Sequence, residues 1–306
     1  METEKKTPEE EKKPTPAAEQ KDEPTPEEKP AENKQTDDNG TADKPDESKA
    51  EDKKDDKKET TKETTIDISG IKFVNEGKLS MGAEIGYPPF ESYADDGVTA
   101  VGFDVDIATE IANRLGLEIN IIDTSFDGIF AGLDKNYDIV CSGVTITPKR
   151  QKTMLFSTPY IQNYQSVVVR KGSDINVSSL KDLNKKVITV QKETTSDILM
   201  SDYKSTGTID VEIVANEKLT SCFTQLKNGE VDAVVVDSTV AESYVAKNSD
   251  DYEIAFTDNS EPEEFGIAIG KGNEKLQAAI NEALAQMEED GYIADAYDYW
   301  FGIGEE

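Results

Sequence analysis

The chain has 306 residues, a net charge of −31 and a pI of about 4.3. Nucleic-acid binding needs a basic surface, and docking on anionic lipid needs clustered Lys and Arg, so this charge argues against both. With no His and only two Cys, the composition argues against a zinc or haem site and excludes every His-dependent catalytic triad. We therefore expect no metal and no cofactor.

Residues 1–65 have the composition of a disordered linker. Apart from Met1, they contain only small, polar, charged or proline residues. Such a segment cannot bury enough apolar surface to offset the entropy lost on ordering. The chain shows no signal peptide and no apolar run long enough to span a bilayer. We expect a precursor whose signal segment is absent from this chain, with a lipid anchor as one means of attaching the tail.

The folded part, Ile66–Glu306, begins with alternating strands and helices. Apolar residues at spacings of four predict a helix from Phe103 to Leu115, which Gly116 ends. Strand–helix alternation at this spacing predicts a parallel sheet with crossover helices. Around that helix, the predicted elements are a strand at Leu79–Ile85, a hairpin-like loop at Tyr93–Gly97, a strand at Leu117–Ile122, a short helix at 126–133 and a strand at Ile139–Cys141.

A second series of similar size follows a polar, aromatic connection at Ser157–Tyr164. Two α/β lobes are therefore predicted: lobe 1 from 66–164 and 261–306, and lobe 2 from 165–260. Cys141 and Cys222 fall in different lobes in apolar settings and are predicted to be buried free thiols. The predicted elements are strands at Gln165–Arg170, Lys186–Val190, Asp210–Val214, Ala233–Val236 and Phe265–Gly270, and helices at Ser178–Leu183, from Thr195, and at Lys218–Asn228, Thr239–Ala246, Glu274–Met287 and Tyr292–Trp300.

The run DIVCSGVTITPKR, residues 138–150, carries the strongest chemical signal. A buried strand leads into Gly143, which lets a ligand approach the backbone. Thr145 adds a hydroxyl and Arg150 a guanidinium, which can hold a carboxylate with two hydrogen bonds. The alternative interpretation is a strand, a loop and a solvent-facing Arg.

Other polar and aromatic residues follow the remaining strands, where ligands of open α/β sheets bind. Glu84 and Tyr87 follow the first strand, Phe126 the second, and Thr195 and Asp237 two strands of the second lobe. Carboxylate-binding groups, a carboxylate for an ammonium and two aromatic walls together predict an α-amino acid site. Each residue also has a purely structural alternative. Glu84 could be a solvated strand end, Tyr87 could pack in a turn, and Phe126 could belong to the core. Thr195 could be a helix N-cap, and Asp237 could cap the helix that follows it.

The chain resembles the solute-binding proteins, family 3, that deliver polar amino acids to ABC importers. The resemblance covers about residues 70–303 and rests on the order of its motifs, which are YPPFE, VGFDVDIATEIANRLG, FDGIFAGL, DIVCSGVTITPKRQKTMLFSTPY, VDAVVVDS and EFGIAIGKGNEKL. It implies a two-lobed periplasmic-binding-protein-like fold of type II, with two hinge strands and a discontinuous lobe 1.

The resemblance also implies roles for single residues. Arg150 would bind the ligand carboxylate with Thr145 and Thr195, and Asp237 would bind the ammonium with the Gly143 carbonyl and the Thr145 hydroxyl. Tyr87 and Phe126 would form aromatic walls, and Glu84 would face the ligand side chain. The chain departs from the Gly-rich sequence of many family members at Lys192–Thr195, so the Thr195 contact is less secure than that of Arg150.

The expected function is ligand capture without catalysis. Closure on a polar amino acid would present the complex to an ABC transporter permease, outside the cytoplasm, with the chain a monomer. Glu84 beside two aromatic rings favours arginine or lysine over glutamine. The alternatives are a ligand-sensing domain and a small dehydratase-type enzyme on the same fold, with Glu84 as its acid.

Overall fold

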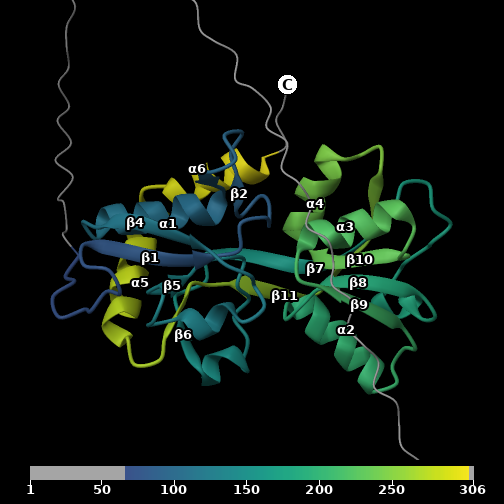
Figure 1. Ribbon diagram of the computed structural model, residues 1–306, viewed down its shortest axis with the longest axis horizontal. Coiled ribbons are helices and arrows are strands. Elements are labelled where there is room, and N and C mark those ends of the chain that lie inside the picture. The colour runs from purple at the N-terminus through teal and green to yellow at the C-terminus, as the bar shows by residue number, and fades with distance from the viewer. Residues whose placement is uncertain (1–65, 303–306) are drawn as a thin grey trace, which may run out of the picture. The chain divides into compact units, whose positions relative to one another are not determined.

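The computed structural model describes residues 66–302, all of which belong to one compact unit. Within it, two five-stranded sheets form the centres of two lobes (Figure 1). The predicted disordered linker, residues 1–65, lies outside the described residues. No helix among residues 66–302 is long and apolar enough to cross a membrane.

The sheet of lobe 1 has the strand order β4-β1-β5-β12-β6. Strands β1, β4 and β5 are parallel, and β12 runs antiparallel to both β5 and β6. The parallel strands agree with the predicted strand–helix alternation, because each crossover helix returns the chain to the same end of the sheet before the next strand begins. The bounds are β1 Lys78–Ala83, β4 Glu118–Asp123, β5 Ile139–Val140, β6 Met154–Phe156 and β12 Ala268–Gly270. A small hairpin pairs β2 (Ser92–Tyr93) with β3 (Ala100–Val101).

The sheet of lobe 2 has the order β11-β7-β10-β8-β9. Strands β8, β9 and β10 are parallel, and β7 runs antiparallel to β10 and β11. Their inward residues are mostly Val and Ile, as expected for strands covered on both faces. The bounds are β7 Ile161–Arg170, β8 Val187–Gln191, β9 Glu212–Asn216, β10 Ala233–Asp237 and β11 Tyr252–Phe265.

Strands β7 and β11 connect the two lobes as hinge strands (Figure 1). Two predictions were wrong here. The segment Ile161–Tyr164, predicted as a connection, is the first part of β7, and β11 had no predicted strand before Phe265. Neither stretch carries a sustained apolar pattern: Ile161–Tyr164 mixes polar and apolar residues, and the middle of β11, Asn259–Pro262, is exposed. The predicted lobe boundaries at 164/165 and 260/261 fall within these strands and stay predictions.

In lobe 1, α1, α5 and α6 pack against one another and share one apolar cluster, whereas the residues around η1 belong to a separate cluster (Figure 1). In lobe 2, α3 and α4 belong to one apolar cluster and α2 to another. The C-terminal helices thus return to lobe 1, as expected. The bounds are α1 Phe103–Arg114, α2 Thr195–Ser205, α3 Leu219–Asn228, α4 Ser238–Lys247, α5 Glu274–Glu289 and α6 Tyr292–Phe301, with 3-10 turns η1 Ile129–Gly132, η2 Arg150–Lys152 and η3 Leu180–Leu183.

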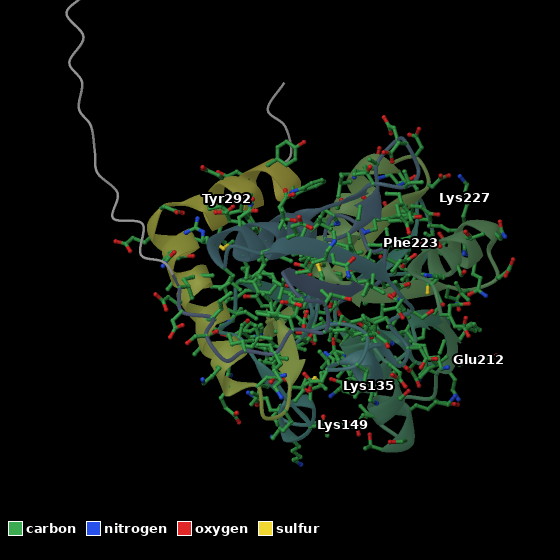
Figure 2. The ribbon with its side chains drawn as sticks, turned by 60° about the vertical axis from the view of Figure 1, so that its left-hand side comes forward. Lys135, Lys149, Glu212, Phe223, Lys227 and Tyr292 are labelled. Atoms are coloured by element: carbon green, nitrogen blue, oxygen red, sulfur yellow. The ribbon has the colours of Figure 1, made fainter. Side chains whose placement is uncertain are left out.

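The periodic apolar residues fill the core. On α1, Phe103, Ile107 and Ile111 are fully buried, because spacings of four place them on one helix face. In lobe 2, Phe223 stacks on Tyr244 with ring centroids 3.7 Å apart. Figure 2 shows Phe223 inside that lobe, while charged residues such as Lys227 point outward. Both cysteines, Cys141 and Cys222, are buried free thiols, as predicted.

Candidate functional site

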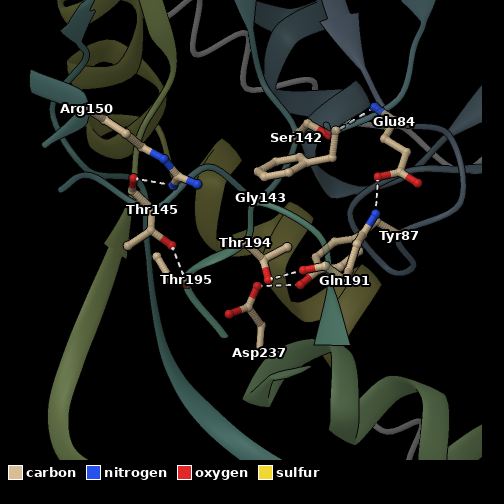
Figure 3. Close-up of a pocket in the computed structure, with 11 residues that line it drawn as sticks. Glu84, Tyr87, Ser142, Gly143, Thr145, Arg150, Gln191, Thr194, Thr195 and Asp237 are labelled. Carbon is tan, nitrogen blue, oxygen red and sulfur yellow. Dashed lines mark hydrogen bonds between the residues drawn. The ribbon is translucent and has the colours of Figure 1, made fainter. Parts of the chain in front are cut away.

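A pocket lies where the two lobes meet (Figure 3). Lobe 1 contributes the residues after β1, β4 and β5, and lobe 2 contributes the residues after β8 and β10. The parallel strands of both sheets therefore point their carboxyl ends at one space. All eight residues predicted for the site line the pocket: Glu84, Tyr87, Phe126, Gly143, Thr145, Arg150, Thr195 and Asp237. Three further residues line it as well, Ser142, Gln191 and Thr194.

Arg150 is buried at one end of the pocket, which overturns the alternative of a solvent-facing Arg. It begins η2, and its Nη1 donates to the Thr145 carbonyl at 2.8 Å. Across the lobe boundary, its Nη2 donates to the Glu193 carbonyl at 3.3 Å. The guanidinium lies 5.7 Å from the ring centroid of Phe126 and 5.2 Å from that of Phe130. Burial lowers the pKa of Arg150, while nearby carboxylates oppose that shift.

Phe126 is both a core residue and a wall of the pocket. Its side chain is 6% exposed and packs with the apolar residues around η1, while its ring also faces Arg150. The alternative interpretation of Phe126 as core is therefore compatible with a place in the site. Phe90, by contrast, is fully buried and does not line the pocket.

Gly143 and Thr145 line the middle of the pocket. Gly143 has φ of +55°, and a Cβ there would lie 3.2 Å from the Tyr87 ring, so glycine suits both the turn and the close approach. Its N–H donates to the buried Asp104 carboxylate at 2.7 Å. Burial raises the pKa of Asp104 to about 6. Asp104 thus holds this loop in place from behind.

Asp237 is a buried carboxylate on the lobe 2 side. It stands at the N-terminus of α4 but makes no side-chain cap, contrary to the alternative interpretation. Its carboxylate instead accepts hydrogen bonds from Tyr87 Oη across the lobe boundary, from Asn163 at 2.7 Å and from Gln165 at 3.0 Å. Burial, and then the charge of Glu263, raise the pKa of Asp237 to about 7.

Thr194, and not Thr195, is the N-cap of α2. The Thr194 hydroxyl accepts a hydrogen bond from the Asp197 N–H at 3.3 Å. Thr195 follows as the first helical residue, and its hydroxyl faces Thr145 at 3.4 Å across the lobe boundary. The hydroxyl of Thr195 therefore points into the site.

Glu84 lies at the other end of the pocket and is 1% exposed, so it is not a solvated strand end. Its Oε2 accepts a hydrogen bond from Gln191 of lobe 2. Its Oε1 has no hydrogen-bond partner among the described residues and lies 3.6 Å from the Lys218 Nζ. The Gln191 Oε1 is likewise buried without such a partner. Burial raises the pKa of Glu84, opposed by Lys218 and Gln191.

Several residues around the site were missed or left out of the predicted set. Ser142 accepts from the Glu84 N–H at 3.0 Å and donates to buried Glu91, which ties the ends of β1 and β5 together. Gln165 and Glu263 come from the hinge strands. The only sequence signal for Ser142 and Gln191 was their position directly after a strand, and Glu263 had none, because its strand was not predicted. No group of three or more potential metal ligands occurs in the described part, residues 66–302.

This fold and site define a two-lobed periplasmic binding protein of type II. The family model for bacterial extracellular solute-binding proteins, family 3, matches residues 79–303. The chain belongs to that family.

Curated relatives and solved structures agree with this assignment. The L-cystine-binding protein TcyJ of Escherichia coli K12 is 33% identical over 232 residues, which cover 76% of this chain and 85% of that protein. ABC transporter arginine-binding protein 1 of the same organism is 31% identical, with coverages of 73% and 90%. The crystal structure of a mutant of ArgBP from T. maritima matches with a TM-score of 0.69 at 40% identity, covering 74% of this chain and 96% of that one.

Proposed function

We propose that the chain captures a polar L-α-amino acid with a cationic side chain, arginine or lysine, between its lobes and delivers it to an ABC importer. The carrying observation is the Glu84 end of the pocket. There, two buried acceptor oxygens, on Glu84 and Gln191, lack hydrogen-bond partners among the described residues. Buried acceptors are costly unless a donor reaches them, and a guanidinium or ammonium supplies several donors.

The backbone end of the ligand would be held at the opposite side. Arg150 binds the α-carboxylate with the hydroxyls of Thr145 and Thr195, and Asp237 binds the α-ammonium with the Gly143 carbonyl and the Thr145 hydroxyl. Support comes from burial, because Arg150 and Asp237 are only 8% and 4% exposed. Charge-assisted hydrogen bonds are strong where water is excluded. Tyr87 and Phe126 form the walls along the ligand.

Binding and closure would be coupled. Each lobe contributes part of the site, and contacts already cross between the lobes, among them Glu84 with Gln191, Tyr87 with Asp237, and Arg150 with the Glu193 carbonyl. A ligand that touches both walls binds the closed form more tightly than the open form and shifts the equilibrium towards it. The closed complex is then the form that a permease recognises.

Transport is proposed over sensing and over catalysis. The relatives reported above are named as binding proteins, two for arginine and one for cystine. A sensing domain would leave amino acid uptake unchanged when the chain is removed. A dehydratase-type enzyme would need Glu84 as a proton donor and would convert its substrate on incubation. The extracytoplasmic location and the monomeric state are part of this proposal.

The first test is thermal unfolding of the full chain with each of the twenty amino acids at millimolar concentration. A ligand at a hundred times its Kd stabilises the folded state by about 2.7 kcal/mol. A shift with arginine or lysine alone supports the amino acid site and the cationic side chain of its ligand. A shift with neutral amino acids alone keeps the amino acid site and rejects the cationic side chain.

A further inference from the structure

The carboxylate of Glu263, on hinge strand β11, is held by three donors from both lobes. Its Oε2 accepts hydrogen bonds from the Thr145 hydroxyl and the Thr195 hydroxyl, each at 2.9 Å. Its Oε1 accepts one from Gln165 Nε2 at 3.1 Å. The side chain is only half-buried, yet its oxygens lie between a lobe 1 loop and the first turn of a lobe 2 helix.

The donors of Glu263 are also the proposed partners of the ligand carboxylate. Thr145 and Thr195 are assigned to that carboxylate above, with Arg150. Burial lowers the pKa of Arg150, and among the charges that oppose this shift, that of Glu263 is the largest. The protein's own carboxylate therefore interacts with the hydroxyls and with the guanidinium that would recognise an α-amino acid.

The backbone brings Glu263 to this position. The pairing of β7 with β11 shifts register between Asp258 and Glu263, so Asn259–Pro262 leave the regular ladder. Pairing resumes with Glu263 opposite Asn163, a residue that also binds Asp237. Two positions further on, Phe265 is fully buried and anchors the strand in lobe 1. Glu263 is thus fixed beside the site.

We infer that Glu263 substitutes for the α-carboxylate of a ligand, so that the same pocket also binds primary amines that have no carboxylate. The class is the decarboxylated counterpart of the amino acid: agmatine for arginine and cadaverine for lysine. Such an amine keeps the ammonium for Asp237 and the cationic end for Glu84, and it leaves Glu263 in place. An amino acid must instead displace Glu263 or place a second carboxylate beside it. The inference rests on the proposed ammonium and side-chain sites.

Charge favours the amine. The pocket wall carries the carboxylates of Glu84 and Asp237 against the single guanidinium of Arg150, and Glu263 adds a third carboxylate at the Arg150 end. An amino acid adds another negative charge at that end, whereas an amine adds none. Like charges held close together in a buried site repel strongly.

The test is calorimetric titration of the full chain with L-arginine, L-lysine, agmatine and cadaverine, each against wild type, Glu263→Gln and Glu263→Ala. Glu264→Gln is the matched control, because its side chain is exposed on the same strand. In wild type, each amine is expected to bind within about tenfold of its amino acid. In Glu263→Gln, amine affinity is expected to fall at least tenfold and amino acid affinity to rise or stay unchanged. The control should match wild type.

Chemical rescue separates this role from a structural one. In Glu263→Ala, acetate at tens of millimolar should restore part of the agmatine affinity, because its carboxylate can occupy the vacated position. A residue that only stabilises the hinge would weaken amine and amino acid equally and would not respond to acetate. That result, or a wild-type chain that binds the amino acid but not its amine, overturns the inference.

The two proposals fail separately. Binding of agmatine or cadaverine that requires Glu263, without binding of L-arginine or L-lysine, supports this inference and rejects the proposed amino acid ligand. Binding of L-arginine or L-lysine without binding of its amine supports the proposed amino acid ligand and rejects this inference. Binding of neither class overturns both.

Discussion

The two ends of the pocket differ in how their polar groups are satisfied. At the Arg150 end, the guanidinium, the hydroxyls of Thr145 and Thr195 and the Asp237 carboxylate all have partners within the protein. At the Glu84 end, acceptor oxygens of Glu84 and Gln191 have no hydrogen-bond partner in the described part of the chain. Under the proposed function, the Arg150 end binds the groups common to every α-amino acid, and the Glu84 end selects the side chain.

The largest effect is expected from Arg150→Ala, which removes the proposed partner of the α-carboxylate that all amino acid ligands share. Loss of a bidentate partner for a desolvated carboxylate costs about 2–5 kcal/mol, so affinity should fall about thirtyfold or more. The loss should be similar for every amino acid that binds, as measured by calorimetry. Arg114→Ala is the control, because Arg114 pairs with Glu110 and Asp290, residues outside the pocket lining. Near-normal binding by Arg150→Ala would contradict the assignment of Arg150 to the ligand carboxylate.

Glu84→Gln is the complementary change, because it should alter selectivity more than general affinity. A charge-assisted hydrogen bond contributes about 1.5–3 kcal/mol, so arginine and lysine should bind about ten- to a hundredfold more weakly. Glutamine should bind unchanged or more tightly. Glu217→Gln, an exposed neighbour of the site, makes the same charge change and should have no effect. An equal loss of affinity for cationic and neutral ligands would show that Glu84 does not select the ligand by its side chain.

The affinity should also depend on pH through Asp237. Burial and the charge of Glu263 raise the pKa of Asp237 to about 7 in the free chain. A ligand ammonium favours the carboxylate, so binding below that pH must release a proton. Affinity should therefore fall as the pH drops from about 7 to about 5, by at most about tenfold per pH unit for one proton. Asp237→Asn should bind more weakly and show a flatter profile between these pH values, whereas an unchanged slope would exclude this group.

The smallest effect concerns Lys218, whose Nζ lies 3.6 Å from the Glu84 Oε1. Its side chain is 45% exposed, so the ion pair contributes no more than about 1 kcal/mol. Lys218→Met should free Glu84 for a cationic ligand and tighten arginine binding up to about fivefold, with no gain for glutamine. Weaker arginine binding in this variant would mean that Lys218 assists the ligand instead of competing with it.

The sequence predicted much of the site because its elements are local. Gly143, Thr145 and Arg150 occur in one short run, and parallel strand ends converge wherever the strands are correctly assigned. The helix starting at Phe103 could be predicted for a similar reason, since its apolar spacing appears within a dozen residues.

The hinge could not be predicted in this way. Strand β11 has a polar middle, and its pairing with β7 shifts register twice, so neither alternation nor apolar content marks it. Glu263 and Gln165 meet only through that pairing, across 98 positions of sequence. Contacts that depend on the register of distant strands leave no local signal. The sequence also did not distinguish Thr194 from Thr195 as the N-cap of α2, because the two adjacent threonines differ only in their backbone geometry.

The most direct test of this account is a crystal structure of the full chain with bound L-arginine. The account predicts that the α-carboxylate lies within hydrogen-bond distance of Arg150, Thr145 and Thr195, with Glu263 displaced from the two hydroxyls. It also predicts that the guanidinium lies against the oxygens of Glu84 and Gln191. A ligand in the reverse orientation, with its side chain at Arg150, or a ligand bound outside the pocket would contradict the account.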